Sequence, residues 1–329
     1  MDEMIFLKKV CDYISSGTLY EVPTKLESNP IFKLYKVVTE KGNYIIKLMN
    51  EQLTSNKLYL ESLYNAEKLE NKLKENNIPL IDANIYNGTK LQTLDNKYFY
   101  VYDYYEATPL ELHNVILEHC KTIGTILGEI HHTDFQTVPK ETRSYLHLRW
   151  RKYLRLAEHK GSPITQILSE HIKMLEHTTE LCNNAVNSLP SVIAICHKNL
   201  TCHNVLWHQG EYKIVGTDSL KYDNPYVELL EIALHWSGFD EYKVNYNLFN
   251  NVTKEYFKVI SRPVVDWNII YDFGYKKYLR KVEYNVKKAL MIDCNSIEES
   301  KIAEKETETA IKEFVYYNSI KDEIIPRLN

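Results

Sequence analysis

The hydrophobic pattern of this chain changes once, near Asp103–Glu106, and that change restricts the folds open to it. Before this point, runs rich in aromatic and β-branched residues predict strands at 31–38, 44–49, 90–94 and 97–103, with one charged helix at 55–76. After it, helical periodicity predicts helices at 109–133, 146–159, 163–188, 226–237, 250–261, 274–291 and 296–322. We therefore predict an α+β fold with a small β-rich lobe over 1–104 and a larger, mainly helical lobe over 105–329.

The composition excludes several kinds of partner and compartment. The chain is 44% apolar and 26% charged, as is usual for a globular protein. Its net charge of −4 comes with no basic block, so we expect neither nucleic acid nor a membrane surface as a partner. No run approaches the roughly 20 apolar residues of a membrane span, and the start lacks the pattern of a signal peptide. The six cysteines have no metal or redox spacing, so we expect a cytoplasmic protein.

One polar loop interrupts the helical lobe and carries residue types used in phosphate chemistry. It reads HKNLTCHN from His197 to Asn204 and precedes the strand-like VLW. Kinase-type sites use a loop His-x-Asp-x-x-x-x-Asn, in which the aspartate aligns the attacking hydroxyl and the asparagine binds Mg²⁺. The spacing here is the same, but position 199 is an asparagine. Taken alone, Asn204 is better explained as a turn residue before a strand, but His197 seven residues upstream favours the functional position.

Three longer segments resemble the aminoglycoside phosphotransferase and choline kinase family, which has a protein-kinase-like fold. They are HKNLTCHNVLW at 197–207, DNPYVELLEIALHW at 223–236 and YLRKVEYNVKKAL at 278–290, with a weaker match in LGEIH at 127–131. The resemblance spans nearly the whole chain. It implies two lobes, an ATP site with Mg²⁺, and a small-molecule acceptor, in many relatives a cationic one.

The resemblance also implies roles for residues of the β-rich lobe. Lys47 corresponds to the lysine that contacts the nucleotide phosphates, and Glu67 to the helix glutamate that pairs with it. Glu61 and Glu70 lie on the same predicted helix and are alternatives to Glu67. The competing interpretation of Lys47 is an exposed lysine beside a hairpin.

Further positions follow from the same resemblance. Asn204 holds the place of the metal-binding amide, while His197 is expected to support the loop through backbone contacts. Asp103 and Tyr105, at the predicted hinge between the lobes, would place their backbone next to the nucleotide base.

The chain departs from the family pattern at the two positions where the family has an aspartate. Asn199 stands at the position of the catalytic aspartate, and a neutral amide cannot hold the proton of an attacking hydroxyl. Counting from Asn204 and from Pro225 puts Gly216 at the position of the metal-binding aspartate. Asp218, two residues on and on the same face of an extended strand, is the alternative metal ligand.

A third departure lies before the Lys47 strand. The phosphate-covering loop is rich in glycine or small residues in most relatives, because backbone amides must approach the phosphates. The corresponding stretch here, Lys25–Pro30, has no glycine and contains Glu27.

These observations leave three functions open. The first is a pseudo-phosphotransferase, a pseudokinase that binds a nucleotide, a small molecule or a protein without efficient transfer. The second is an active ATP-dependent phosphotransferase acting on an aminoglycoside, choline or sugar hydroxyl. The third is a structural component of an assembly, such as a spore coat. We expect the double substitution Asn199→Asp with Gly216→Asp to strengthen Mg²⁺-dependent nucleotide binding.

Overall fold

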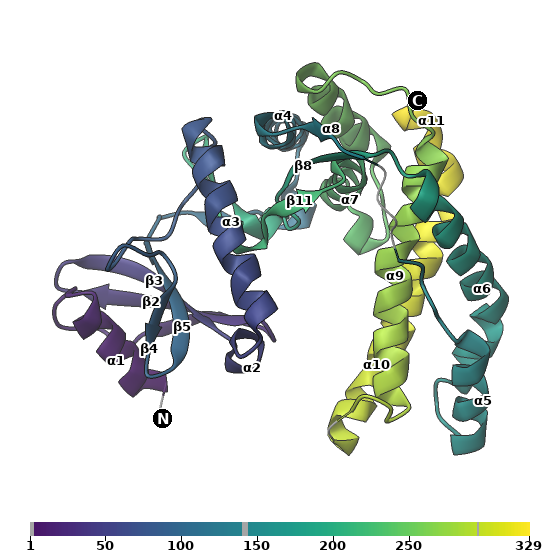
Figure 1. Cartoon of the computed structure of the whole chain (residues 1–329), viewed down its shortest axis with the longest axis horizontal. Helices are drawn as coiled ribbons and strands as arrows, with labels where there is room; N and C mark the ends of the chain where they lie inside the picture. Colours follow the sequence, from purple (N-terminus) through teal and green to yellow (C-terminus); the bar gives the residue numbers. More distant parts are fainter. Residues whose placement is uncertain (1–2, 140–143, 295) are drawn as a thin grey trace. The chain divides into compact units, whose positions relative to one another are not determined.

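The computed structural model describes residues 3–139, 144–294 and 296–329 and divides into two compact units (Figure 1). The first unit contains the chain up to Asn114 together with Ile195–Tyr222, and the second contains Val115–Ala194 and Asp223–Asn329. An antiparallel sheet lies in the N-terminal part and helices fill the C-terminal part, so the predicted α+β class is confirmed. The lobe boundary at 104/105 was placed where the hydrophobic pattern of the sequence changes, and it stays a prediction.

A five-stranded antiparallel sheet forms the centre of the first unit, in the order β1-β2-β3-β5-β4. The strands are β1 (Thr24–Ser28), β2 (Phe32–Thr39), β3 (Gly42–Met49), β4 (Gln92–Leu94) and β5 (Lys97–Asp103). Asp95 and Asn96 join β4 to β5 with φ angles of 50° and 61°, the left-handed conformations of a tight hairpin turn. The predicted strands and this hairpin are therefore present.

A helix packs against part of each face of the sheet (Figure 1). Helix α1 (Glu3–Tyr13) packs Phe6, Leu7 and Val10 against alternate residues of β2, β3 and β5. Helix α3 (Lys57–Glu75), preceded by the short α2 (Glu51–Thr54), begins at the Asn56 N-cap and supplies Leu63 to a cluster on the other face. Neither α1 nor β1 was predicted from the sequence.

The polar loop belongs to the first unit and is held by a second small sheet. Strands β6 (Thr108–Pro109), β9 (Val205–His208) and β10 (Glu211–Ile214) pair in the order β10-β9-β6. Single helical turns lie at η1 (Leu112–Asn114), η2 (Cys202–Asn204) and η3 (Thr217–Ser219). The Ile214 N–H donates to the Pro79 carbonyl at 2.8 Å, and the Ile81 N–H donates to the Ile214 carbonyl at 2.9 Å. The hairpin before η3 is thereby fixed to the segment that follows α3.

The second unit is mainly helical. Its helices are α4 (Leu117–Thr133), α5 (Trp150–Lys160), α6 (Thr165–Ser188), α7 (Pro225–Trp236), α8 (Tyr246–Val259), α9 (Trp267–Ala289), α10 (Ile297–Ser319) and α11 (Lys321–Leu328), with η4 (Phe239–Glu241). Strands β8 (Val192–Cys196) and β11 (Lys221–Asp223) each begin in one unit and end in the other, and the short β7 (Gln136–Thr137) pairs with β8. The helix predicted at 296–322 is present as α10, which ends at Ser319 and is followed by α11.

Close packing within this unit depends on glycine. Helix α9 packs against α6 and α10, and α4 packs against α8 (Figure 1). A Cβ atom at Gly124 of α4 would overlap the Val252 carbonyl oxygen of α8, so the two helices approach where a side chain is missing. Within the described ranges, no helix is long and apolar enough to cross a bilayer.

Candidate functional site

Lys47 and Asp218 form a buried ion pair within the first unit. The Lys47 Nζ atom on β3 lies 2.6 Å from Asp218 Oδ1 in η3. Their side chains are 7% and 13% exposed, and the ring of Phe32 covers Nζ at 4.0 Å from the ring centroid. The interpretation of Lys47 as an exposed strand lysine is therefore wrong, and the partner of Lys47 comes from η3.

The expected pair between Lys47 and Glu67 is wrong for this structure. The Glu67 carboxylate instead accepts hydrogen bonds from the Leu91 N–H and the Tyr100 hydroxyl, each at 3.1 Å. Burial raises the pKa of Glu67, and these hydrogen bonds oppose the shift only in part. The residue ties α3 to β5 and the segment before β4, and a role at a cofactor stays a prediction.

The alternative helix acids have other partners too. Glu70 lies 3.1 Å from the Lys90 ammonium and accepts a hydrogen bond from Thr217 Oγ1 at 3.2 Å. Burial raises the pKa of the Glu70 carboxyl, while the Lys90 ammonium opposes the shift. Glu61 pairs with Lys57 on the solvent-exposed side of α3. Glu70 thus links α3 to η3 one residue before Asp218, and no local sequence signal marks Lys90 as its partner.

The polar loop is held by His197, as expected. The Asn199 N–H donates to His197 Nδ1 at 3.3 Å, so Nε2 carries the proton and donates to the Val215 carbonyl at 3.1 Å. The Ser219 hydroxyl contacts the His197 carbonyl at 2.7 Å and the Gly216 carbonyl at 2.8 Å. The loop and η3 form one hydrogen-bonded assembly around a buried imidazole.

Asn199, Asn204 and Gly216 come together on this assembly. Asn199 is exposed, and its carbonyl accepts a hydrogen bond from Asn204 Nδ2 at 2.8 Å. A Cβ atom at Gly216 would lie 3.1 Å from Asn204 Oδ1. A side chain at 216 would therefore face the amide at 204, which is the arrangement that a shared metal site requires. Gly216 has a φ of 80°, a left-handed conformation that opposes an aspartate there.

The stretch predicted as a phosphate-covering loop differs in the structure. Residues 24–28 form strand β1, which leaves only a tight turn before β2. The Asn29 side chain accepts from the Ile31 and Phe32 N–H groups at 2.9 Å, and the Asn29 N–H donates to the Phe32 carbonyl at 3.0 Å. Pro30 has no N–H. Every backbone donor of this turn is used within it, so the turn offers no amides to a phosphate.

Asp103 and Tyr105 lie at the end of β5, where the hinge was expected. The Asp103 carboxylate accepts from Asn84 Nδ2 at 2.9 Å, and the Tyr105 carbonyl accepts from the Ala107 N–H at 2.9 Å. The Tyr105 ring packs edge-on against His208. Contact of these residues with a nucleotide base stays a prediction.

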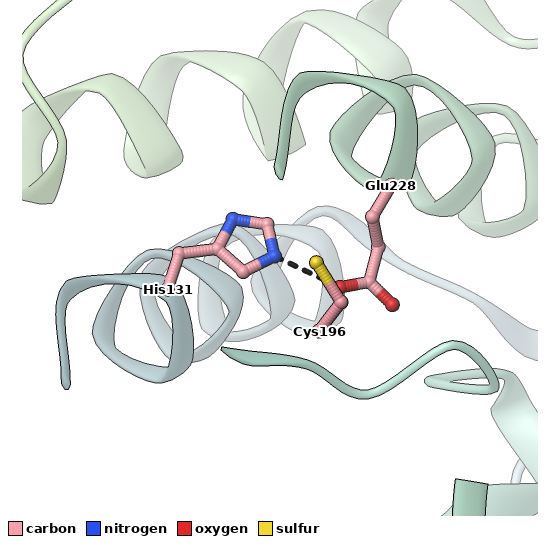
Figure 2. A group of neighbouring side chains, drawn as sticks. All are labelled: His131, Cys196 and Glu228. Carbon is pink, nitrogen blue, oxygen red and sulfur yellow. Dashed lines mark hydrogen bonds and ion pairs between the residues drawn. The ribbon is translucent and has the colours of Figure 1, made fainter. Parts of the chain in front are cut away.

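A separate buried cluster lies in the second unit. Figure 2 shows the His131 imidazole directed at the Glu228 carboxylate, with Nε2 and Oε2 2.8 Å apart. The other ring nitrogen lies 2.9 Å from the Tyr256 hydroxyl, and all three residues are buried. The cluster joins α4, α7 and α8, and it connects the LGEIH segment to the segment at 223–236.

Comparison with known proteins identifies the fold. The sequence model described as the phosphotransferase enzyme family matches residues 24–241. A crystal structure of spectinomycin phosphotransferase with ADP and spectinomycin aligns with a TM-score of 0.67 at 14% identity, covering 95% of this chain and 98% of that one. Amicoumacin kinase in complex with AMP-PNP, Ca²⁺ and its ligand aligns at 0.63 with 16% identity, covering 95% and 94%.

A solved choline kinase has a similar fold. Choline kinase from Cryptosporidium parvum Iowa II aligns with a TM-score of 0.54 at 12% identity, covering 98% of this chain and 96% of that one. No curated protein sequence matches this chain. At such identities the structural likeness establishes the kinase-like fold alone, and the chemistry must be argued from the residues present.

Proposed function

Because the chain belongs to the phosphotransferase enzyme family, we propose that it keeps the family's fold as a pseudo-phosphotransferase, without efficient phosphoryl transfer. The observation that carries the proposal is the joint replacement of both acidic positions around Asn204. Asn199 and Gly216 flank that amide in the structure, and neither supplies a carboxylate. The loss is local, since the loop keeps its hydrogen bonds to the His197 imidazole and the Ser219 hydroxyl.

The missing base alone would slow transfer. A carboxylate at 199 would align the attacking hydroxyl and accept its proton, a contribution of about 10²–10⁴-fold. The amide of Asn199 can orient a hydroxyl but cannot accept its proton at neutral pH.

The residues present do not fit a Mg²⁺ site. Mg²⁺ would supply positive charge against the phosphates, and proteins hold this ion through one or two carboxylates. Around Asn204, position 216 has no side chain. The nearby acid, Asp218, has Oδ1 occupied by the Lys47 ammonium at 2.6 Å. Ligation of a metal by Asp218 would compete with a buried ion pair.

The phosphate-contacting groups support the same proposal. The charge of Lys47 is neutralised by Asp218, so a triphosphate would have to displace a carboxylate to reach it. The amides of the β1–β2 turn are already bonded within that turn. The proposed role is therefore the binding of a ligand without efficient transfer. That ligand is a nucleotide, another small molecule (a cationic one included) or a protein.

One competing function has specific support. Lys47, Asn204 and Asp218 are retained, and two structurally similar proteins were solved with ADP or with AMP-PNP and Ca²⁺. An active phosphotransferase would use ATP and Mg²⁺ on a hydroxyl of an aminoglycoside, choline or sugar, with Asp218 leaving Lys47 to ligate the metal.

Turnover separates the two functions. ATP consumption and product phosphate should be measured in Mg²⁺ with aminoglycosides, choline, ethanolamine and sugars as acceptors, with the variant Lys47→Ala as background. We expect the wild type to give no more product than Lys47→Ala. Acceptor-dependent turnover that Lys47→Ala abolishes would establish the active enzyme instead.

A further inference from the structure

The strand registers arrange the sheet face opposite α1 into two rows of side chains. Residues directly opposite one another in paired strands point to the same face. One row contains Glu27, Leu34, Lys47 and Tyr100. The adjacent row contains Thr24, Lys36, Ile45 and Tyr102. The alternate residues, among them Tyr35, Val37 and Ile46, pack beneath α1, which confirms that both rows lie on the other face.

The first row is unfavourable for an anion. Lys47 is neutralised by Asp218, and Glu27 adds a carboxylate at the β1 end of the same row. A phosphate placed here would meet two acids and one cation, so the net field of the row repels it.

The second row is favourable for an anion. The Lys36 ammonium is half-buried and lies 3.9 Å from the centroid of the Tyr104 ring. Among the residues that the structure describes, no carboxylate pairs with Lys36. Thr24 presents a hydroxyl opposite it, and burial raises the pKa of Tyr102 so that its phenol stays neutral. The row itself therefore contributes a cation and hydrogen-bond donors and no acid, while Asp218, which pairs with Lys47, acts on Tyr102 from outside the row.

We propose that Lys36, rather than Lys47, holds the anionic group of a phosphate-bearing ligand on this sheet, without a metal. The Tyr104 ring supports the ammonium through a cation–π contact, which keeps the side chain on the face while leaving its N–H groups free to donate. The inference rests on the proposed function, because a site that transferred phosphate would need Lys47 and Mg²⁺ at the same phosphates. The inference identifies the class of ligand, one carrying a phosphate, that the sheet could still bind without contacts from Lys47 and Mg²⁺.

The test is a calorimetric titration in EDTA with two probes, ATP and tripolyphosphate, and with adenosine as the probe that lacks phosphate. The wild type is compared with Lys36→Gln, which removes the charge, and Lys36→Arg, which keeps it. Lys41→Gln is the matched control, because Lys41 is an exposed lysine in the turn between β2 and β3 of the same sheet.

We expect both phosphate probes to bind and Lys36→Gln to weaken them at least about tenfold, as for a lost charge-assisted contact. Lys36→Arg should restore most of the affinity, and Lys41→Gln should change it less than about twofold. Affinity for both probes should fall with salt more steeply in the wild type than in Lys36→Gln. Because Arg rescue and salt slope do not follow from a merely structural role, they separate binding from folding.

The failures are distinguishable. Absence of binding by both probes, or binding that Lys36→Gln leaves unchanged while Lys47→Gln abolishes it, overturns the inference about Lys36. Both outcomes concern ligand binding and not phosphoryl transfer, so neither would contradict the proposed loss of transfer. Turnover in Mg²⁺ would overturn the proposed function itself, whatever Lys36→Gln does.

Discussion

Replacing Asp218 with asparagine removes the carboxylate from a buried ammonium. The two side chains are 7% and 13% exposed, and their charged atoms lie 2.6 Å apart. With an effective dielectric constant near 20, the attraction at that distance is about 6 kcal/mol, and the cost of burying both charges offsets part of it. Removing one partner of such a pair typically costs about 3–5 kcal/mol, because the other charge stays buried. Asparagine keeps an oxygen that can accept a hydrogen bond, so we expect about 3 kcal/mol.

The assay is equilibrium urea denaturation followed by circular dichroism. The double variant Lys47→Met with Asp218→Leu should recover most of the lost stability, because no charge remains buried. The exposed pair between Lys57 and Glu61 is the matched control, with side chains that are 89% and 50% exposed. Glu61→Gln should change the free energy of unfolding by less than about 1 kcal/mol.

The reasoning would be refuted if Asp218→Asn cost no more than Glu61→Gln. It would also be refuted if the double variant lost as much stability as the single variants Lys47→Met and Asp218→Leu added together. Either result would mean that the two charges are not coupled in the folded protein.

Three further predictions concern separate residues. Burial raises the folded-state pKa of Glu67 above 4.5, so its ionisation costs stability as pH rises through that value. Glu67→Gln should therefore unfold at higher urea than wild type at pH 7, and the gain should vanish below about pH 4 in denaturation curves. Gly216→Asp alone should cost about 1–2 kcal/mol, from its φ of 80°, while combined with Asn199→Asp it should create Mg²⁺-dependent ATP binding in calorimetry. Gly274→Ala should cost about 1–3 kcal/mol in urea denaturation, because its methyl group would overlap the Tyr317 hydroxyl in the core of the second unit.

The elements with strong periodicity were predictable from the sequence. Strand β2 alternates in burial, and β3 and β5 carry runs of aromatic and aliphatic residues that are buried on both faces. Helix α3 repeats leucines at helical intervals because it buries one face. Strand β1 was not predictable, since all five of its residues are exposed and no burial pattern marks it. Helix α1 has only eleven residues and buries four of them.

The sequence indicated candidate residues of the site, but it did not indicate which charged residues pair with one another. Lys47 was identified from its strand and Asn204 from its loop, because those signals are local. The partner of Lys47 is 171 residues away in sequence, and nothing local favours Asp218 over the four glutamates of α3. Glu70 and Glu67 are drawn to other partners by residues that only the fold brings near them, Lys90 and Tyr100. That Lys36 lacks a carboxylate partner among the described residues likewise follows only from the strand register, which sets its neighbours on the sheet.

The most direct test of the central claim is a calorimetric titration of the wild-type protein with ATP, first in Mg²⁺ and then in EDTA. We predict the same affinity in both, because the carboxylates that would hold the metal at positions 199 and 216 are missing. Binding that requires Mg²⁺ would contradict the account and show that the remaining residues still assemble a metal site.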